Sequence, residues 1–248
     1  MTMKTAGLAL CLSLASGLAL AQPTHVMVRA QALDAKFIGD HTGGADITLT
    51  DVRTGRVLAR GRTAGGTGDT GRIMKAPHSR SGGLSDAQTA GFDAVVDIES
   101  PTLVRAEGVG PLGRLRSVIH VTSTTWIYPG QDIVGDGWIL TFPGLVVEPE
   151  AAQSTDGTVE VSANVTLMCG CPIEPGGIWD AANYAVEASL VQGGRVLATA
   201  PLAYAGKTSQ FAGRFPAQPP GNYTVRVTAK DRTTINAGTV VYPLTLKP

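Results

Sequence analysis

The sequence is poor in cysteine and aromatic residues and has no excess of either charge. It contains three cysteines, and Phe, Trp and Tyr together make up 5% of its 248 residues. Lys and Arg number 20, as do Asp and Glu, so the formal net charge is zero, and no basic run occurs. Proteins that bind nucleic acid or an anionic membrane through charge carry basic patches. The composition therefore argues against both kinds of partner.

The sequence also lacks the motifs of common enzyme classes and any long apolar run in its main part. No Ser/His/Asp order, no His-Glu-x-x-His and no phosphate-binding glycine motif stands out. No segment after residue 21 is long and apolar enough to span a membrane. We therefore predict a non-enzymatic protein without a membrane span.

The first 21 residues have the features of a secretory signal peptide. Lys4 supplies the positive start, residues 6–20 form a short apolar run, and Ala19-Leu20-Ala21 fits the small-x-small cleavage pattern. Cys11 lies inside the apolar run and is expected to be removed with it. The mature chain is expected to begin near Gln22 and to be periplasmic or secreted.

Glycine, by contrast, is abundant at 31 residues, and valine, threonine and leucine dominate between the glycines. This composition favours many short strands joined by turns. We predict an all-β protein of two tandem β-sandwich domains, residues 22–148 and 149–248. The predicted strands of the first domain are His25–Ala32, Ala45–Val52, Arg56–Arg62, Phe92–Ile98, Thr102–Glu107, Ser117–Tyr128 and Trp138–Val147. Those of the second are Thr158–Met168, Tyr184–Gln192, Arg195–Thr199, Ser209–Phe215, Tyr223–Lys230 and Thr239–Leu246.

In the first domain, the segments ADITLTDV and RVLARGRT are joined by Arg53-Thr54-Gly55, a short hairpin connection that contains glycine. About 20 residues here resemble the opening of bacterial transthyretin-like or carboxypeptidase-regulatory-like sandwiches. The resemblance implies a fold and nothing more. Residues 63–90 form a long loop rich in Gly, Ser, Thr and Asp. A loop this long in a compact domain is usually functional or mobile, and we interpret this one as mobile.

The second domain contains Gly193-Gly194 as a hairpin turn and the segment PPGNYTV at residues 219–225. These features resemble a bacterial immunoglobulin-like sandwich over roughly 90 residues. The resemblance implies that Tyr223 is the corner tyrosine at the entry of strand F, its hydroxyl bonded to the preceding turn. Val225 stands where an antibody domain has its second disulfide cysteine, so the usual bridge between the sheets is not expected.

The segment TVEVSANVTLMCGCP, residues 158–172, contains the most informative pattern. Its odd-numbered residues from Val159 to Leu167 are apolar and alternate with polar ones, as in a strand with one buried face. Cys169 and Cys171 continue the same parity. In the immunoglobulin-like topology they lie at the start of the B–C loop, at the same end as the F–G loop (residues 231–237). The linker is expected to enter at that end too, so the pair is expected to face the interface between the domains.

Three hypotheses fit Met168-Cys169-Gly170-Cys171. The thiolates of Cys169 and Cys171, with Met168 as a third ligand, suit a soft metal such as copper(I). A disulfide across one residue closes a small ring and suits redox exchange. A structural role is the third: Cys169 is then a small buried residue, an oxidised pair pins the loop, and replacing Cys171, past the strand end, has the milder effect.

The other candidate ligands are scattered. No two of His25, His41, His78 and His120 have the spacing of a metal site. His41 and His78 lie in predicted loops, and we interpret both as solvated. We interpret His120 as a partly buried residue in mid-strand, and His25 as too far from the new N-terminus for an amino-terminal copper site. The acidic glycine-rich turns at Asp69, Asp132–Asp136 and Asp156 lack a full calcium-loop signature and are interpreted as turns.

Three functions therefore stay open. The first is an exported, non-enzymatic protein of the cell envelope that binds a partner or copper through the Cys-Gly-Cys pair. The second is a structural or protein-interaction module of a surface or secreted complex, and the third is a thiol–disulfide accessory protein.

Overall fold

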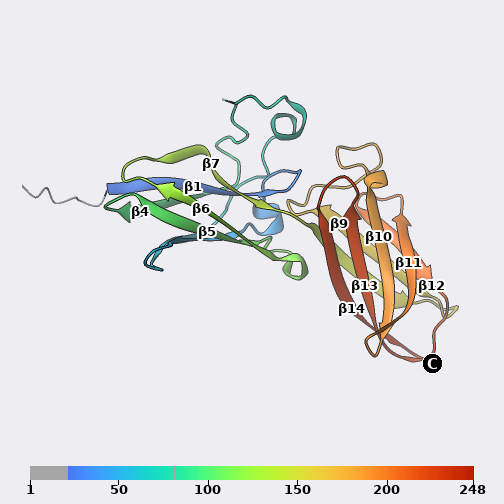
Figure 1. Ribbon diagram of the computed structural model, residues 1–248. Coiled ribbons are helices and arrows are strands. Elements are labelled where there is room, and N and C mark those ends of the chain that lie inside the picture. Colours follow the sequence, from blue (N-terminus) through green and yellow to red (C-terminus); the bar gives the residue numbers. More distant parts are fainter. Residues whose placement is uncertain (1–21, 81) are drawn as a thin grey trace, which may run out of the picture.

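The computed structural model describes residues 22–80 and 82–248, so the predicted signal peptide lies outside the described residues. The described chain is all-β, with fourteen strands and four short helical turns, as predicted. Figure 1 shows two β-structures placed end to end, which we call the N-terminal half (residues 22–142) and the C-terminal half (residues 145–248). Among the described residues, no helix has the length and apolar character needed to cross a membrane.

The N-terminal half is a sandwich of two sheets. Sheet order is β4-β1-β7 in one layer and β3-β2-β5-β6 in the other. All pairs are antiparallel except β1 and β7, which run parallel from Val26 to Ala32 of β1. The strands are β1 (Gln22–Ala32), β2 (Asp46–Asp51), β3 (Val57–Arg62), β4 (Phe92–Ile98), β5 (Thr102–Gly110), β6 (Ile119–Ile127) and β7 (Ile133–Phe142).

The C-terminal half contains β8 (Leu145–Gln153), β9 (Val159–Leu167), β10 (Tyr184–Gln192), β11 (Arg195–Tyr204), β12 (Gln210–Phe215), β13 (Gly221–Asp231) and β14 (Ala237–Leu246). Their order is β14-β13-β10-β11-β12-β9-β8. Strand β11 pairs with β10 as far as Leu202 and then with β12 at Ala203 and Tyr204. The change of partner folds the strands into two layers, β14-β13-β10-β11 against β12-β9-β8, the arrangement of an immunoglobulin-like sandwich.

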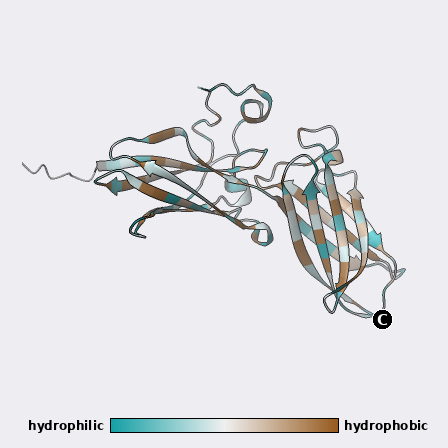
Figure 2. Ribbon diagram, viewed as in Figure 1, coloured by the Kyte–Doolittle hydropathy of each residue, from teal (hydrophilic) through white to brown (hydrophobic). Residues whose placement is uncertain are grey.

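Burial in the C-terminal half follows the predicted parity. Along β9 the odd-numbered residues are buried, while Glu160 is exposed and the other even-numbered residues are only half-buried. Figure 2 shows the matching alternation of hydrophobic and hydrophilic positions on the strands. Val225 on β13 is fully buried, and the Tyr223 hydroxyl donates to the Pro219 carbonyl oxygen at 2.9 Å, the contact expected of a corner tyrosine.

One predicted strand is wrong. Residues 138–147 are not continuous, because β7 ends at Phe142 and β8 begins at Leu145, each in a different half. Pro143 lacks the N–H that a ladder needs, and Gly144 has a positive φ of 138°. The chain therefore crosses between the halves at 143–144, and the boundary predicted at 148/149 falls inside β8, which pairs with β9 from Leu145 to Gln153. The number of independent domains stays a prediction.

The long loop at residues 63–90, which we interpreted as mobile, is fastened to the N-terminal half. It contains the π-helical turn η2 (Gly71–Lys75), and Ile73 packs with Phe37 and Ala90 in a small separate core. The buried Arg29 donates to the carbonyl oxygens of Thr89 and Ala90. These contacts hold the base and the middle of the loop in place.

A second anchor of the loop is Asp136, which lies within β7 near its beginning. Its carboxylate accepts the backbone N–H of Leu84 at 2.8 Å and that of Ser85 at 2.7 Å, together with the Ser85 hydroxyl at 2.6 Å. Burial raises the Asp136 pKa, but these hydrogen bonds and the nearby Arg29 outweigh it and hold the pKa below its usual range. The parts of the loop up to Lys75 and from Leu84 on are thus positioned against the N-terminal half.

Candidate functional site

The Met168-Cys169-Gly170-Cys171 segment follows β9 and lies at the junction of the two halves. The sulfurs of Cys169 and Cys171 form a disulfide with Cα atoms 5.4 Å apart. Both cysteines are buried, with 1% and 3% of their surface exposed. The Gly170 N–H donates to the Leu167 carbonyl at 2.8 Å, which closes a tight turn in which Gly170 has a φ of +75°.

This turn contacts the N-terminal half directly. A Cβ atom added to Gly170 would lie 2.7 Å from Cδ2 of His41 and 3.0 Å from Cγ2 of Thr42, in η1 (Asp40–Thr42). A Cβ atom at Gly144, in the crossing segment, would meet the methyl end of Met168. The motif therefore packs against both η1 and the crossing segment, where it was predicted to lie.

The disulfide bears on the three hypotheses for this motif. Two sulfurs bonded to each other present no thiolate, so this oxidised form has no thiolate pair for copper(I). Met168 is 2% exposed and packs at the junction. The geometry supports a structural role, while copper binding stays a prediction for the reduced chain.

Two side chains of the C-terminal half hold the Leu33-Asp34 turn of the N-terminal half. Trp179, in the B–C loop, donates its indole N–H to the Asp34 carbonyl oxygen at 2.9 Å. Asn236, in the F–G loop and 1% exposed, donates to the Leu33 carbonyl oxygen at 3.0 Å and accepts the Gly144 N–H at 2.7 Å. The B–C and F–G loops thus meet at the junction, as their topology predicts.

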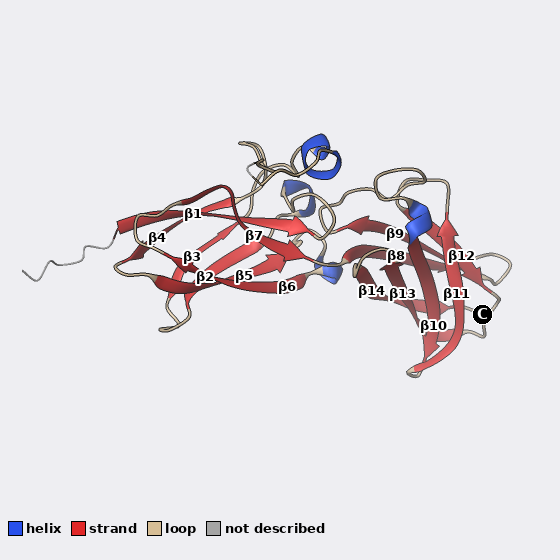
Figure 3. Ribbon diagram, turned by 45° about the horizontal axis from the view of Figure 1, so that its top comes forward, coloured by secondary structure: helices blue, strands red, loops and turns tan. Residues whose placement is uncertain are grey.

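The turn η3 (Leu115–Ser117) adds a third set of contacts. Ser117 accepts the Val147 N–H at 3.2 Å, and Arg114 lies 3.3 Å from Glu148. Figure 3 shows the short helical turns, in blue, near the junction of the two halves. Buried side chains of both halves form one continuous hydrophobic cluster. These contacts join the two halves at the junction.

Beside these contacts lies a cavity of about 650 Å³, which we call the junction cleft. Its N-terminal wall consists of Lys36, His41, Thr67, Thr70 and Lys75, and its C-terminal wall of Cys169–Pro172, Glu174 and Gly176–Trp179. Ligand cavities typically measure about 300–1,000 Å³. The junction cleft thus has the size of a binding site.

The charges of the junction cleft are unequal. Lys36, Lys75 and His41 stand on one wall, and Glu174 is the single carboxylate of the lining. Within residues 22–80 and 82–248, none of these four groups takes part in an ion pair. The Lys36 ammonium makes one long bond, 3.5 Å, to the Gly68 carbonyl oxygen. The cleft is therefore basic on its N-terminal wall.

The carboxylates of Asp34 and Asp231 and the phenol of Tyr184 interact electrostatically near the junction. Asp34 is exposed as a residue, but partial desolvation of its carboxylate by neighbouring groups raises its pKa, and the negative charge of Asp231 raises it further. Burial of Asp231 would raise its pKa too, but hydrogen bonds from Thr233 and Thr234 outweigh this and lower it. Burial and the same two carboxylates raise the pKa of Tyr184. The phenol thus stays neutral at physiological pH.

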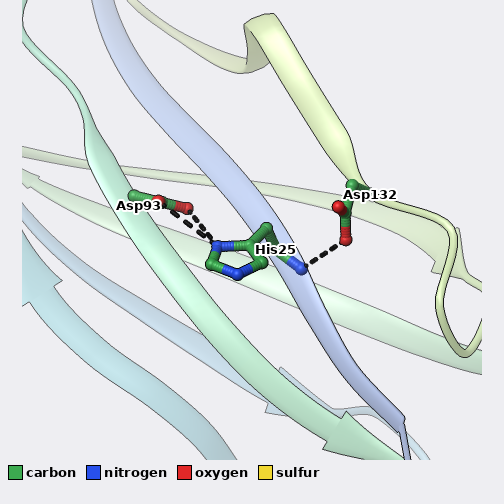
Figure 4. Close-up of polar contacts among 3 residues, drawn as sticks. All are labelled: His25, Asp93 and Asp132. Carbon is green, nitrogen blue, oxygen red and sulfur yellow. Dashed lines mark hydrogen bonds and ion pairs between the residues drawn. The ribbon is translucent and has the colours of Figure 1, made fainter.

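The four histidines do not gather, and among the described residues no group of three or more His, Cys, Asp or Glu side chains is placed to hold a metal ion. His25 has its Nδ1 3.3 Å from both Asp93 oxygens, and its backbone N–H donates to Asp132 at 2.8 Å (Figure 4). His78 bonds the Ile73 carbonyl oxygen at 2.8 Å. His120 was interpreted as partly buried, which is wrong. Its side chain projects into solvent from the exposed face of β6.

Two of the three acidic turns, at Asp69 and Asp156, bind their own backbone, as interpreted from the sequence, whereas Asp132 and Asp136 accept N–H groups from distant segments. Asp69 accepts the N–H of Arg72 at 2.6 Å, and Asp156 accepts both the N–H and the hydroxyl of Thr158. Hydrogen bonds of this kind stabilise turns.

Comparisons with known proteins add little to this geometry. No family model matches the chain, and no curated protein matches it. Among solved structures, the alpha chain of the chicken interferon gamma receptor is similar at 6% identity and a TM-score of 0.32. The match covers 92% of this chain and 98% of that chain. A likeness this weak has no bearing on function, and the fold assignment rests on the strand order.

Sequence reasoning singled out the cysteine pair, with a disulfide among its open alternatives, but missed most of its surroundings. Neither the indole of Trp179 nor the amide of Asn236 was predicted to bond the Leu33-Asp34 turn. No sequence motif indicates Lys36 and Lys75, because they come from different segments that only folding brings together on one wall.

Proposed function

We propose that this protein is a non-enzymatic interaction module of the cell envelope that binds a protein partner through the junction cleft. The observation that supports the proposal is a cavity of ligand-binding size lined by loops of both halves. Loops positioned by a rigid scaffold are a common place for binding residues. A periplasmic or secreted location, expected from the N-terminal segment, would give such a module access to envelope partners.

The fixed junction favours binding over a structural role alone. Trp179 and Asn236 hold the Leu33-Asp34 turn, so the two walls keep a set separation. A site held rigid before binding loses less conformational entropy when a partner enters. The disulfide in the C-terminal wall then acts by fixing the turn at Gly170.

Site-specific photo-cross-linking in cells that make the protein tests the proposal. A photo-reactive amino acid in place of Ile178, 43% exposed on the rim of the cleft, is expected to give a discrete adduct with one protein. The control places it at Val134, 67% exposed in the N-terminal half and outside the cleft lining. Equal adducts at both positions, or none at Ile178, would contradict binding through the cleft.

A further inference from the structure

The two walls of the junction cleft differ in chemistry, and the difference indicates what the cleft binds. We propose that its occupant is an acidic, extended peptide segment of the partner, with a carboxylate beside Lys36 and Lys75. An apolar side chain of the same segment then lies on the opposite wall. This inference rests on the proposed function and adds the chemical class of the ligand.

The basic wall has cations without internal partners. Lys75 ends η2, and Lys36 precedes the buried Phe37 that packs against Ile73 of the same turn. The small core thus fixes the position of both backbones. Within the part of the chain that the structure describes, Lys75 has no hydrogen bond or ion pair from its ammonium group, and Lys36 has only its long contact with Gly68.

Asp40 and Asp69, which directly adjoin residues of this wall in the sequence, already accept hydrogen bonds. Asp40 accepts the Gly65 N–H at 3.1 Å, and Asp69 accepts the Arg72 N–H. Neither forms an ion pair among the described residues. A carboxylate from outside would therefore meet lysines that have no internal counter-ion, and it would gain from both charges.

The opposite wall is mostly apolar. Trp179 is 7% exposed and Ile178 43% exposed, and Pro172 lies beside the disulfide. Glu174 is the exception, and the hydroxyl of Thr208 lies 3.4 Å from its carboxylate. Apolar side chains of a peptide would cover this wall, whereas a free inorganic anion would leave it open to water.

The lining also argues for a carboxylate over a phosphate. It contains no arginine, whose planar fork is the usual bidentate partner of phosphate, but two lysines that act as point charges. A volume of about 650 Å³ accommodates a few side chains and not the face of a whole domain. A short segment with alternating acidic and apolar residues fits both walls.

Peptide titration followed by NMR tests the inference on the purified mature chain. The probes are acetyl-Leu-Glu-Leu-Glu-Leu-amide and its counterpart with Gln in place of Glu. The indole N–H signal of Trp179 reports on the cleft, and those of Trp126 and Trp138 serve as internal controls. We expect the acidic peptide to shift the Trp179 signal and to bind about tenfold more tightly than the Gln peptide, because two exposed ion pairs are lost.

A matched pair of variants separates a local effect from net charge. Lys36→Met with Lys75→Met is expected to lower affinity for the acidic peptide about tenfold. Lys207→Met with Lys247→Met removes the same charge outside the cleft lining and is expected to leave it unchanged. Equal loss in both pairs, equal binding of the Gln peptide, or no Trp179 shift with either peptide would overturn the inference.

Two further outcomes separate the inference about the peptide from the proposed function. If inorganic phosphate moves the Trp179 signal as far as the acidic peptide does, the site binds free anions and the peptide inference is wrong. If the adduct at Ile178 persists in the Lys36→Met/Lys75→Met variant, the proposed function stands and the acidic occupant does not. Loss of the adduct in that variant alone supports both.

Discussion

The Nδ2 of Asn236 lies 3.0 Å from the Leu33 carbonyl oxygen and donates to it across 203 positions of sequence. The same side chain accepts the N–H of Gly144, where the chain crosses between the halves. One buried amide thus ties together three segments that are far apart in the sequence. Replacing Asn236 with Ala is expected to lower the free energy of unfolding by about 1–3 kcal/mol, because a buried N–H and a buried carbonyl lose their partner. Chemical denaturation measures the loss, and an unchanged midpoint would contradict the role of this amide.

Gly170→Ala should destabilise the junction more than Gly176→Ala. Both glycines have a φ near +70°, so both variants incur a similar backbone cost of about 1 kcal/mol. Only at Gly170 would the new Cβ meet His41 and Thr42, while at Gly176 nothing lies within 4 Å. Thermal melts of the two variants are expected to differ by roughly a further 1–3 kcal/mol. Equal melts would show that the Gly170 turn does not pack tightly on η1.

Asp34→Asn should stabilise the protein at neutral pH. The raised pKa of Asp34 means that its ionised form is disfavoured in the folded state. The penalty is absent below the unfolded pKa of about 3.9, and it is complete once the pH exceeds the raised folded pKa. Asn also adopts positive φ readily, and Asp34 has a φ of 53°. Melting temperatures above the parent at pH 7, converging near pH 3.5, are expected, and a lower melting temperature at pH 7 would contradict the penalty from desolvation and from Asp231.

Asp231→Asn should instead destabilise the protein at neutral pH. Its lowered pKa means that the carboxylate stabilises the fold above the unfolded pKa of about 3.9, and that this contribution is lost as the pH falls through the folded pKa. The Asn variant keeps one acceptor oxygen and loses the other, so it cannot accept from both Thr233 and Thr234 as the carboxylate does. A lower melting temperature than the parent at pH 7, with the gap closing towards pH 3, checks this assignment.

The disulfide should stabilise the chain through both cysteines alike. The sequence predicted a milder effect for Cys171→Ser than for Cys169→Ser, but the structure buries both residues. A buried hydroxyl without a partner costs about 1–3 kcal/mol at either position. Thermal melts of the two variants decide, and a near-native Cys171→Ser variant would restore the earlier expectation.

Copper binding needs its own measurement. The soft-metal hypothesis predicts about one copper(I) per reduced chain and loss of most affinity in either serine variant, because a hydroxyl is a poor ligand for a soft ion. The oxidised chain is expected to bind none through these sulfurs. Titration of both redox forms against a competing chelator decides, and no stoichiometric copper in the reduced parent ends the hypothesis.

The sequence predicted what depends on local periodicity and turn chemistry. The alternation along β9 predicted that Val165 is buried and that both cysteines continue the buried side of the strand. The Pro-Gly-x-Tyr segment predicted the hydrogen bond from the Tyr223 hydroxyl to the preceding turn. It did not predict the break at 143–144, because the apolar residues of β7 and β8 continue through it. The anchors of the long loop were missed too, since Arg29 looks like an ordinary strand residue until the fold brings Ala90 beside it.

The parallel pairing of β1 and β7 also determines how the N-terminal half would respond to tension. β1 begins at the end of the molecule far from the C-terminal half, and β7 leads through the crossing segment into β8 (Figure 1). Pulling residue 22 away from residue 145 would slide these two strands past each other along their length. The hydrogen bonds from Val26 to Ala32 would then be loaded in shear together instead of opening one by one as in a zipper. The N-terminal half is in this sense a mechanical clamp in line with the junction.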